Sequence, residues 1–398
     1  MKRWLTATLA SAMTLVMAGL TACSDDVKKD VISLRVWGAQ EDQALLGEMI
    51  DSFEKAHADK KYEITLGVVG EDNAQKRVLE DPNAAADIFS FPNDQIRTFV
   101  NAKALYEITR NRETVQNENT AASVEAATVD DKLYAYPMTS DNGYFLYYDS
   151  RVLSAKDVET LDGLMAAAQK AGRKVIMDVS DGWYCSSFFL GAGCKVGLDA
   201  NGKQTCDFNN ARGVQAAKAV QQFTAHPAFM TGGNDIVTGS MGSTACAAVS
   251  GTWNADALKE KLGDGYAAAK LPTFTLGDGQ VQMGSFGGFK LLGVNALTAH
   301  PADAMELAEW LTNEQSQLLR FEKRAMGPSN RKAAENEKVK ANAALAALTA
   351  QGEFASSQKD VLSTFWSPVE AFGLAMETKD YSKSLQVQLD AMVEQITR

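Results

Sequence analysis

The chain has 398 residues, of which 45% are hydrophobic and 22% charged, and its 50 acidic residues outnumber its 39 Lys and Arg residues to give a formal net charge of −11. This balance is typical of a folded globular protein and excludes disordered and collagen-like chains, while the length suggests two domains. The acidic balance, with no long basic stretch to neutralise phosphates, argues against a nucleic acid partner.

The first 22 residues are typical of a targeting segment. Two basic residues open the chain, a mainly apolar stretch too short to span a membrane comfortably follows over residues 5–20, and small residues lead to Cys23. The order Leu-Thr-Ala-Cys at residues 20–23 resembles the lipobox of bacterial lipoproteins, which implies a signal peptide over 1–22, an acylated Cys23 (carrying palmitate-type chains) and a lipid-anchored linker over 23–30. A plain secretory peptide with an incidental cysteine is the alternative.

Hydrophobic periodicity predicts alternating strands and helices in the mature chain. Apolar residues alternate over 32–36, recur at helical spacing over 45–53, and form further strand patterns over 62–68 and 87–91. Later strands are predicted over 144–148, 174–179, 244–250 and 288–294, and helices over 211–224, 303–321 and 385–396. This order favours a mainly parallel sheet covered by helices, with ligands beyond the carboxyl ends of the strands.

Four cysteines lie beyond the lipobox, and they permit three disulfide pairings. Cys194 and Cys206 flank an Asn-Gly step at residues 201–202, a hairpin turn signal that would bring the two thiols together across adjacent strands. We therefore expect the pair Cys194–Cys206, with Cys185–Cys246 as the remainder. A zinc site is the rival interpretation, but no close Cys-x-x-Cys step supports it, so no metal or cofactor is expected.

Five short segments, in the order in which they occur, carry a resemblance to a known family. They are Leu34-Arg35-Val36-Trp37, Ala86-Asp87-Ile88-Phe89 leading to Asn93-Asp94, Lys132-Leu133-Tyr134-Ala135-Tyr136-Pro137, Gly251-Thr252-Trp253, and Ser363-Thr364-Phe365-Trp366. In order and spacing they resemble bacterial extracellular solute-binding protein family 1, the maltose- and maltodextrin-binding proteins of ABC transporters, over nearly the whole mature chain.

The resemblance implies a two-lobed α/β periplasmic-binding-protein fold of type II, with mixed, mainly parallel sheets, helices on both faces and three hinge crossings. The N-terminal lobe would hold residues 31–137 plus 289–326, and the C-terminal lobe residues 138–288 plus 327–398. The glycines at 287–288 and the Gly-Pro-Ser at 327–329 fall where crossings are expected, although ordinary turns are an alternative.

A sugar offers apolar faces that aromatic rings can cover and hydroxyls that carboxylates or amides can bind. The candidate stacking residues are Phe91, Trp183, Tyr184, Trp253 and Trp366, and the resemblance implies aromatic residues at all of these positions except Tyr184. The candidate hydroxyl partners are Gln40, Glu41, Asp94, Gln95, Asp141 and Asp181. Among them, Glu41 and Asp94 follow separate predicted strands at the end where the cleft is expected. Core packing is the alternative for the aromatics, as we expect for Trp310, and a solvated loop is the alternative for the polar residues. The family has basic residues at positions matching Asp42, Gln95 and Glu370, which leaves the exact sugar open.

We expect a receptor rather than an enzyme. The resemblance implies a lipid-anchored, extracytoplasmic substrate-binding subunit of an ABC importer that binds maltose or maltodextrin-type oligosaccharides, acts as a monomer and delivers to permease subunits. The main alternative is a secreted glycoside hydrolase, whose two carboxylates the sequence alone does not place. A surface interaction lipoprotein without a small ligand is a third reading. The sequence has no Gly-x-Ser-x-Gly elbow or phosphate loop, and its three His residues lack metal-ligand spacing.

Overall fold

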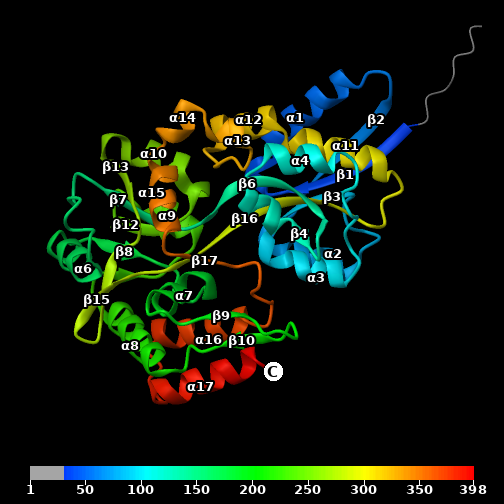
Figure 1. Cartoon of the computed structure of the whole chain (residues 1–398). Helices are drawn as coiled ribbons and strands as arrows, with labels where there is room; N and C mark the ends of the chain where they lie inside the picture. The colour runs from blue at the N-terminus through cyan, green and yellow to red at the C-terminus, as the bar shows by residue number, and fades with distance from the viewer. Residues whose placement is uncertain (1–30) are drawn as a thin grey trace, which may run out of the picture.

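The computed structural model describes residues 31–398 and confirms a two-lobed α/β fold with mixed sheets (Figure 1). The predictions for the signal peptide, Cys23 and the linker fall on residues outside this range. Two long antiparallel strands, β6 (Ala135–Gly143) and β16 (Ser285–Val294), run between the lobes, and a third connection follows helix α12 (Glu314–Arg324). These are the three expected crossings.

The first lobe is built on a six-stranded sheet of order β17-β16-β3-β1-β2, with β6 also paired to β16. Its edge strand β17 (Ala355–Ser357) comes from the C-terminal part of the chain and pairs with the start of β16 beside the hinge. Strand β1 (Val31–Gly38) is parallel to β2 (Lys61–Val68) and to β3 (Ile88–Pro92), whereas β16 is antiparallel to β3. The remaining elements of this lobe are η1 (Gln40–Asp42), α1 (Gln43–Ala56), η2 (Glu71–Asn73), α2 (Ala74–Glu80), η3 (Asn93–Gln95), α3 (Ile96–Asn101), α4 (Arg112–Glu118), α5 (Ala121–Ala126), β4 (Thr128–Val129), β5 (Lys132–Leu133) and α11 (Pro301–Thr312).

The core of the first lobe follows from the predicted periodicities. Leu34 and Val36 of β1 are 1% and 0% exposed, while Arg35 between them is exposed, and α1 buries its apolar stripe with Phe53 at 0% exposure. One hydrophobic cluster contains these side chains and draws its members from residues 34–136 and 291–311. Two separated stretches of chain therefore share one core.

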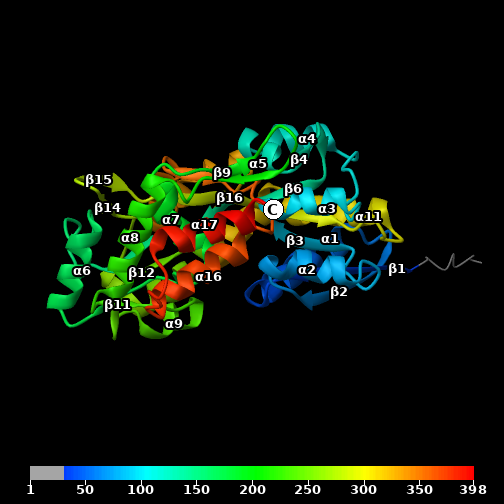
Figure 2. The same ribbon diagram turned by 90° about the horizontal axis from the view of Figure 1, so that it is seen from below.

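The second lobe is built on a five-stranded mixed sheet of order β11-β8-β12-β7-β13. Its elements, with the short helices and strands beside the hinge, are β7 (Phe145–Asp149), α6 (Leu161–Lys170), β8 (Lys174–Ile176), α7 (Gly182–Gly191), β9 (Val196–Leu198), β10 (Gln204–Cys206), α8 (Ala211–Ala225), β11 (Phe229–Met230), α9 (Asn234–Ser240), β12 (Ala245–Ser250), η4 (Thr252–Asn254), α10 (Ala255–Leu262), η5 (Gly263–Gly265), β13 (Tyr266–Ala269), β14 (Thr273–Leu276), β15 (Gly279–Gln282), α13 (Arg331–Ala334), α14 (Glu337–Lys340), α15 (Ala343–Gly352), β17 (Ala355–Ser357), α16 (Trp366–Glu377) and α17 (Leu385–Ile396). In Figure 2, α2 of the first lobe and α9 of the second lie on the same side of the molecule.

The helix predicted over 303–321 is two helices, α11 and α12. The chain breaks at Asn313, whose backbone is extended with ψ 174° and whose side chain accepts a hydrogen bond from Ser316 N at 2.9 Å. Asparagine is a favoured N-cap because its side chain satisfies a free N–H of the first turn, so a new helix starts here. Trp310 lies in α11 among core residues, as expected.

The predicted disulfides are wrong for this structure, in which Cys185, Cys194, Cys206 and Cys246 are all free. The hairpin of β9 and β10 forms, but its register sets Cys206 opposite Val196, two residues beyond Cys194. A cysteine displaced by two residues from the directly opposed position is a diagonal neighbour, too distant for an unstrained bridge. Cys246 instead directs its sulfur to the carbonyl oxygen of Lys174 at 3.7 Å, and Cys185 is buried on α7.

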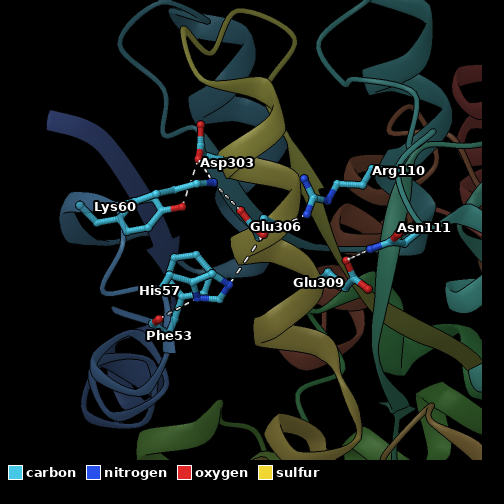
Figure 3. Close-up of polar contacts among 9 residues, drawn as sticks. Phe53, His57, Lys60, Arg110, Asn111, Asp303, Glu306 and Glu309 are labelled. Atoms are coloured by element: carbon cyan, nitrogen blue, oxygen red, sulfur yellow. Dashed lines mark hydrogen bonds and ion pairs between the residues drawn. The ribbon is translucent and has the colours of Figure 1, made fainter. Parts of the chain in front are cut away.

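A polar cluster fastens α11 to the outer edge of the first lobe (Figure 3). The Nζ atom of Lys60 lies 2.8 Å from carboxylate oxygens of both Asp303 and Glu306, and Arg110 Nη2 lies 2.9 Å from the other oxygen of Glu306. His57 Nε2 approaches that same oxygen at 3.7 Å. Hydrogen bonds to the two carboxylates raise the pKa of Lys60 above its usual range. The cluster joins the turn between α1 and β2, and the loop before α4, to α11 on the outside of the lobe.

Candidate functional site

A cavity of about 780 Å³ lies between the lobes. The first lobe contributes the segments that directly follow three neighbouring parallel strands, namely residues 39–41 after β1, residues 70–72 after β2 and residues 94–95 after β3. The sequence places these loops together because the carboxyl ends of parallel strands open at the same edge of a sheet. The second lobe contributes the starts of α7, α9 and α16 and the short helix η4.

Aromatic rings form the wall of the cavity on the second lobe. Trp183 and Tyr184 begin α7, Trp253 lies in η4 and Trp366 begins α16, and all four side chains are half-buried. The ring centroids of Trp183 and Trp253 are 5.9 Å apart with a tilt of 36°. Half-burial at the wall of a cavity means that each ring packs on the protein with part of its surface and leaves part for a ligand.

A hydrogen-bonded chain crosses the cavity from one lobe to the other. Trp183 donates its indole N–H to Gln358 Oε1 at 3.0 Å, and Gln358 donates to Asp94 Oδ1 at 2.8 Å. Burial raises the pKa of Asp94 to about 7. Asp94 can therefore titrate near neutral pH at the point where the two lobes meet.

Asp181 has a structural and an electrostatic role at the start of α7. Its carboxylate caps the helix by accepting a hydrogen bond from Trp183 N at 2.8 Å. Burial raises its pKa to about 6, and the nearby charges of Asp178, Glu370 and Asp72 act in the same direction. Asp72 belongs to the first lobe and Glu370 to α16, so carboxylates of both lobes converge here.

Lys290 carries a positive charge into the cavity from the middle of β16. Its Nζ atom lies 2.7 Å from Glu71 Oε2 and 5.8 Å from the centroid of the Trp253 ring. Burial lowers the pKa of Lys290, but the negative charges of Glu71, Asp141 and Asp42 more than offset this and leave it raised. The ammonium is therefore held charged between a carboxylate and an indole face.

The structure brings nine of the eleven predicted ligand residues to the cavity. They are Gln40, Glu41, Asp94, Gln95, Asp181, Trp183, Tyr184, Trp253 and Trp366. Gln95 is only 6% exposed, and its side chain bonds to backbone groups of Glu71, Asp72 and Gln75, so its main contacts organise the loop after β2.

Two predicted residues do not line the cavity. Phe91 is 0% exposed and packs against Phe89 and Phe99, because its side chain lies on the core face of β3. Asp141 is 1% exposed and accepts hydrogen bonds from Thr252 and Gly327 behind the cavity wall. The predicted direct contact is wrong for Phe91, and Asp141 is placed one layer behind the surface.

Several lining residues escaped the sequence analysis, chiefly Glu71, Asp72, Asn234, Lys290, Gln358 and Glu370. The sequence did contain an indication that Lys290 has a special role, because a lysine inside the apolar run of a central strand needs a buried partner. The sequence contained no such indication for Gln358, since a glutamine in an irregular segment has no recognisable role until the two lobes are placed together.

Within residues 31–398, no group of three or more His, Cys, Asp and Glu side chains is arranged to hold a metal ion. Over the same residues, no helix combines the length and the apolar character needed to cross a bilayer.

The chain matches the family described as "Bacterial extracellular solute-binding protein" over residues 48–347. It belongs to this family of bacterial extracellular solute-binding proteins, which confirms the resemblance seen in the sequence. Among curated relatives, a galactooligosaccharide-binding protein of Bacillus subtilis (strain 168) is 26% identical over 361 residues, covering 85% of this chain and 83% of the relative.

Solved structures show the same fold. One that is described as being with acarbose is 28% identical, with a TM-score of 0.84, over 93% of this chain and 99% of the other. A maltodextrin-binding protein from L. casei BL23, solved without ligand, is 26% identical with a TM-score of 0.78, over 93% of this chain and all of the other (100%). The maltotriose-binding protein of Thermus thermophilus, at 18% identity and a TM-score of 0.78, shares the fold.

Proposed function

We propose that this protein binds an oligosaccharide in the cavity between its lobes, without cleaving it, as the substrate-binding subunit of an ABC importer. The observation that carries this proposal is the pairing of two surfaces across the cavity. The indoles of Trp183, Trp253 and Trp366 stand on the second lobe, and polar side chains after β1, β2 and β3 stand on the first. Lobe closure would enclose a ligand between them.

This pairing matches the chemistry of a sugar. The C–H face of a pyranose is locally apolar and stacks on an indole, while its hydroxyls need acceptors and donors once water is removed. Glu41, Asp94 and Asp181 supply acceptors, and Lys290 and Asn234 supply donors. The cavity volume also falls within the range of about 300–1,000 Å³ that is usual for small-ligand sites.

Maltose and maltodextrins are the proposed ligands. Support comes from the solved neighbour named for maltodextrin and from the tryptophans at the cavity wall. Galactooligosaccharides are the second candidate class, because the curated relative of Bacillus subtilis is named for binding them. Both classes present pyranose faces and hydroxyl rims, so the same walls serve either.

A glycoside hydrolase is the competing function, and one observation favours it. Asp94 and Asp181 have pKa values raised to about 7 and about 6, and a hydrolase needs a carboxylic acid of raised pKa beside a second carboxylate. Two contacts argue against a hydrolase. Asp181 caps helix α7 and Asp94 accepts a hydrogen bond from Gln358, so both carboxyls are held in place as binding groups. Relatives named as binding proteins support the receptor.

The proposal includes the organisation of the mature chain. Residues 31–137 plus 289–326 form the N-terminal lobe and residues 138–288 plus 327–398 the C-terminal lobe. The first-lobe core, drawn from residues 34–136 and 291–311, supports these limits. Cys23 carries the lipid that holds the monomer at the outer side of the cell membrane, within reach of the permease. Mass spectrometry of the N-terminal peptide from membranes tests this, and an unmodified Cys23 would refute the anchor.

Calorimetry with a sugar panel tests the ligand. We expect saturable binding of maltose, maltotriose or maltotetraose, weaker binding of glucose, and no product in the same mixtures after prolonged incubation, read by chromatography. Binding of galactooligosaccharides alone would replace the proposed ligand class. Release of shorter sugars would overturn the receptor in favour of the hydrolase.

A further inference from the structure

Asp141 lies at the junction of the hinge and the cavity wall. Its Oδ2 atom accepts two hydrogen bonds, one from the Thr252 hydroxyl at 2.7 Å and one from Gly327 N at 2.8 Å. Thr252 directly precedes Trp253 in η4, and Gly327 lies in the third crossing after α12. One buried carboxylate on the β6 crossing therefore joins the residue before a cavity-lining tryptophan to another crossing.

The third crossing is shaped to reach this carboxylate. A Cβ atom on Gly327 would lie 3.1 Å from Asp141 Cβ and 2.9 Å from Leu345 Cδ2, so a side chain would push the two segments apart. The backbone just before it turns through a left-handed residue, Ala325, with φ 52°. Ser140 N also donates to the Gly327 carbonyl oxygen at 2.8 Å, which ties the two crossings by backbone as well.

The second oxygen of Asp141 is buried without a partner. Among the described residues, Asp141 Oδ1, Thr139 Oγ1, Ser140 Oγ and the Nε and Nη2 atoms of Arg320 all lack hydrogen-bond partners. Asp141 and Arg320 are each 1% exposed, and the negative charge of Asp141 acts on both Arg320 and Lys290.

Unused donors and acceptors of opposite charge in one buried region are costly. A rearrangement of the hinge that brought Asp141 Oδ1 to a cationic donor would remove part of that cost.

We propose that Asp141 is a positioning residue that couples the placement of Trp253 to the arrangement of the hinge. Its bond to Thr252 holds the segment that carries Trp253, and its bond to Gly327 holds the third crossing, so a movement of one is passed to the other. Asp141 itself does not touch the ligand. The effect on ligand affinity rests on the proposed function, whereas the effect on the lobes does not.

Asp141→Asn disturbs this link without changing the size of the side chain. The amide NH₂ must take one of the two oxygen positions. At the Oδ2 position it faces the Gly327 N–H, which cannot turn into an acceptor. At the Oδ1 position it leaves the amide oxygen to accept from Thr252 and Gly327, but a neutral amide oxygen accepts weaker hydrogen bonds than a carboxylate. Either choice weakens the link.

Asp149 gives a matched control within the same lobe. It is 2% exposed, like Asp141, but its carboxylate binds Arg151 at 2.7 and 2.8 Å on β7, away from the hinge and the cavity. Asp149→Asn therefore removes an equally buried charge with no route to Trp253. Thr252→Val removes the other end of the link while keeping its shape and leaving Asp141 in place.

The first readout is the dissociation constant for the best-bound sugar of the panel. We expect Asp141→Asn and Thr252→Val each to weaken binding about tenfold, and the double variant to bind no worse than the weaker single one, because both changes break one link. Asp149→Asn should stay within about twofold of the wild type. Losses of about threefold or less in both hinge variants, or fully additive losses in the double variant, would overturn the coupling.

The second readout needs no ligand. Spin labels introduced at Glu80→Cys on α2 and Asp235→Cys on α9, in a Cys206→Ser background, report the distance across the cavity by pulsed electron resonance. We expect Asp141→Asn to shift or broaden the ligand-free distance distribution and Asp149→Asn to leave it unchanged. An unchanged distribution in Asp141→Asn overturns the inference. If the wild type binds no sugar, the proposed function fails and this readout alone decides the inference.

Discussion

Truncating Trp253 to alanine tests the aromatic wall most directly. The ring lies 5.9 Å from the Trp183 ring and 5.8 Å from the Lys290 ammonium, and its indole N–H is fixed by Asn234 Oδ1 at 2.9 Å. Its orientation in the cavity is therefore set before a ligand arrives. Trp253→Ala removes both the surface that a pyranose would cover and the cation–π partner of Lys290.

The magnitude follows from the area of one ring face. A tryptophan buries about 200 Å² in full, and a sugar stacked on its free face covers roughly a third of that. At about 25 cal/mol per Å² this contact contributes about 1.7 kcal/mol, which corresponds to roughly a fifteenfold change in the dissociation constant. Loss of the fixed position of Lys290 adds to this, so we expect a loss of tenfold or more.

Calorimetry on Trp253→Ala, Trp253→Phe and Trp310→Ala separates stacking from general damage. Trp253→Phe keeps an apolar face and should lose less affinity than the alanine variant. Trp310 packs against Phe53 and His57 at 5.9 and 5.6 Å in the other lobe, so Trp310→Ala should lower the melting temperature and leave affinity unchanged. Equal affinity of Trp253→Ala and the wild type would refute the stacking argument.

Four further outcomes are expected from the cavity and the residues that support it. The carboxyls of Asp94 and Asp181, with pKa values of about 7 and about 6, should lose charge as the pH falls from 8 to 5, so calorimetry should show sugar affinity falling in that direction. Because both pKa values are raised above the usual value of 3.8, these two groups bind more protons in the folded state than in the unfolded state. Their contribution to the free energy of unfolding therefore decreases as the pH rises from about 4 to 7, a trend that thermal melts of Asp94→Asn should show in reduced form. Gln358→Leu breaks the link from Trp183 to Asp94 and should weaken binding by about threefold to tenfold with little change in melting temperature, whereas unchanged affinity would exclude the link from binding. At Gly373 an added Cβ would lie 1.9 Å from a backbone oxygen of the loop before α7, so Gly373→Ala should reduce the unfolding free energy by about 2 kcal/mol or more in denaturant melts, and a stable variant would contradict the close packing.

The sequence predicted most of the secondary structure because that structure follows from local periodicity. Strand β1, helices α1 and α8, and the 12-residue helix α17 lie where their apolar spacing places them. The prediction of a single helix over 303–321 was wrong, and the reason is also local. Asn313 caps a new helix there, although the apolar spacing continues on both sides of it.

The candidate site depends more on tertiary packing than the secondary structure does. Phe91 lies near the end of a strand and Trp183 near the start of a helix, and the sequence does not separate their fates. The core face of β3 buries Phe91, whereas the docking of α7 at the cavity leaves Trp183 half-exposed. The cysteine pairing failed because hairpin register is set by the strands and not by the turn signal alone. Gln358 reaches Asp94 across 264 residues of sequence, a contact that no local pattern encodes.

The amino-acid sequence by itself determined the class of this protein: an acidic two-lobed α/β chain of the extracellular solute-binding family, with tryptophans and carboxylates in loops that follow strands. The acidic balance and the order of strands and helices are local or additive along the chain, whereas the family and its two lobes came from the resemblance of five short segments. Only the tertiary structure decided which of these side chains share the cavity, that Lys290 joins them, and that Asp141 stands behind the wall and holds Thr252 to the hinge. The physical reason is that burial and hydrogen bonding depend on the register of strands and the docking of lobes, in which residues far apart in sequence become neighbours.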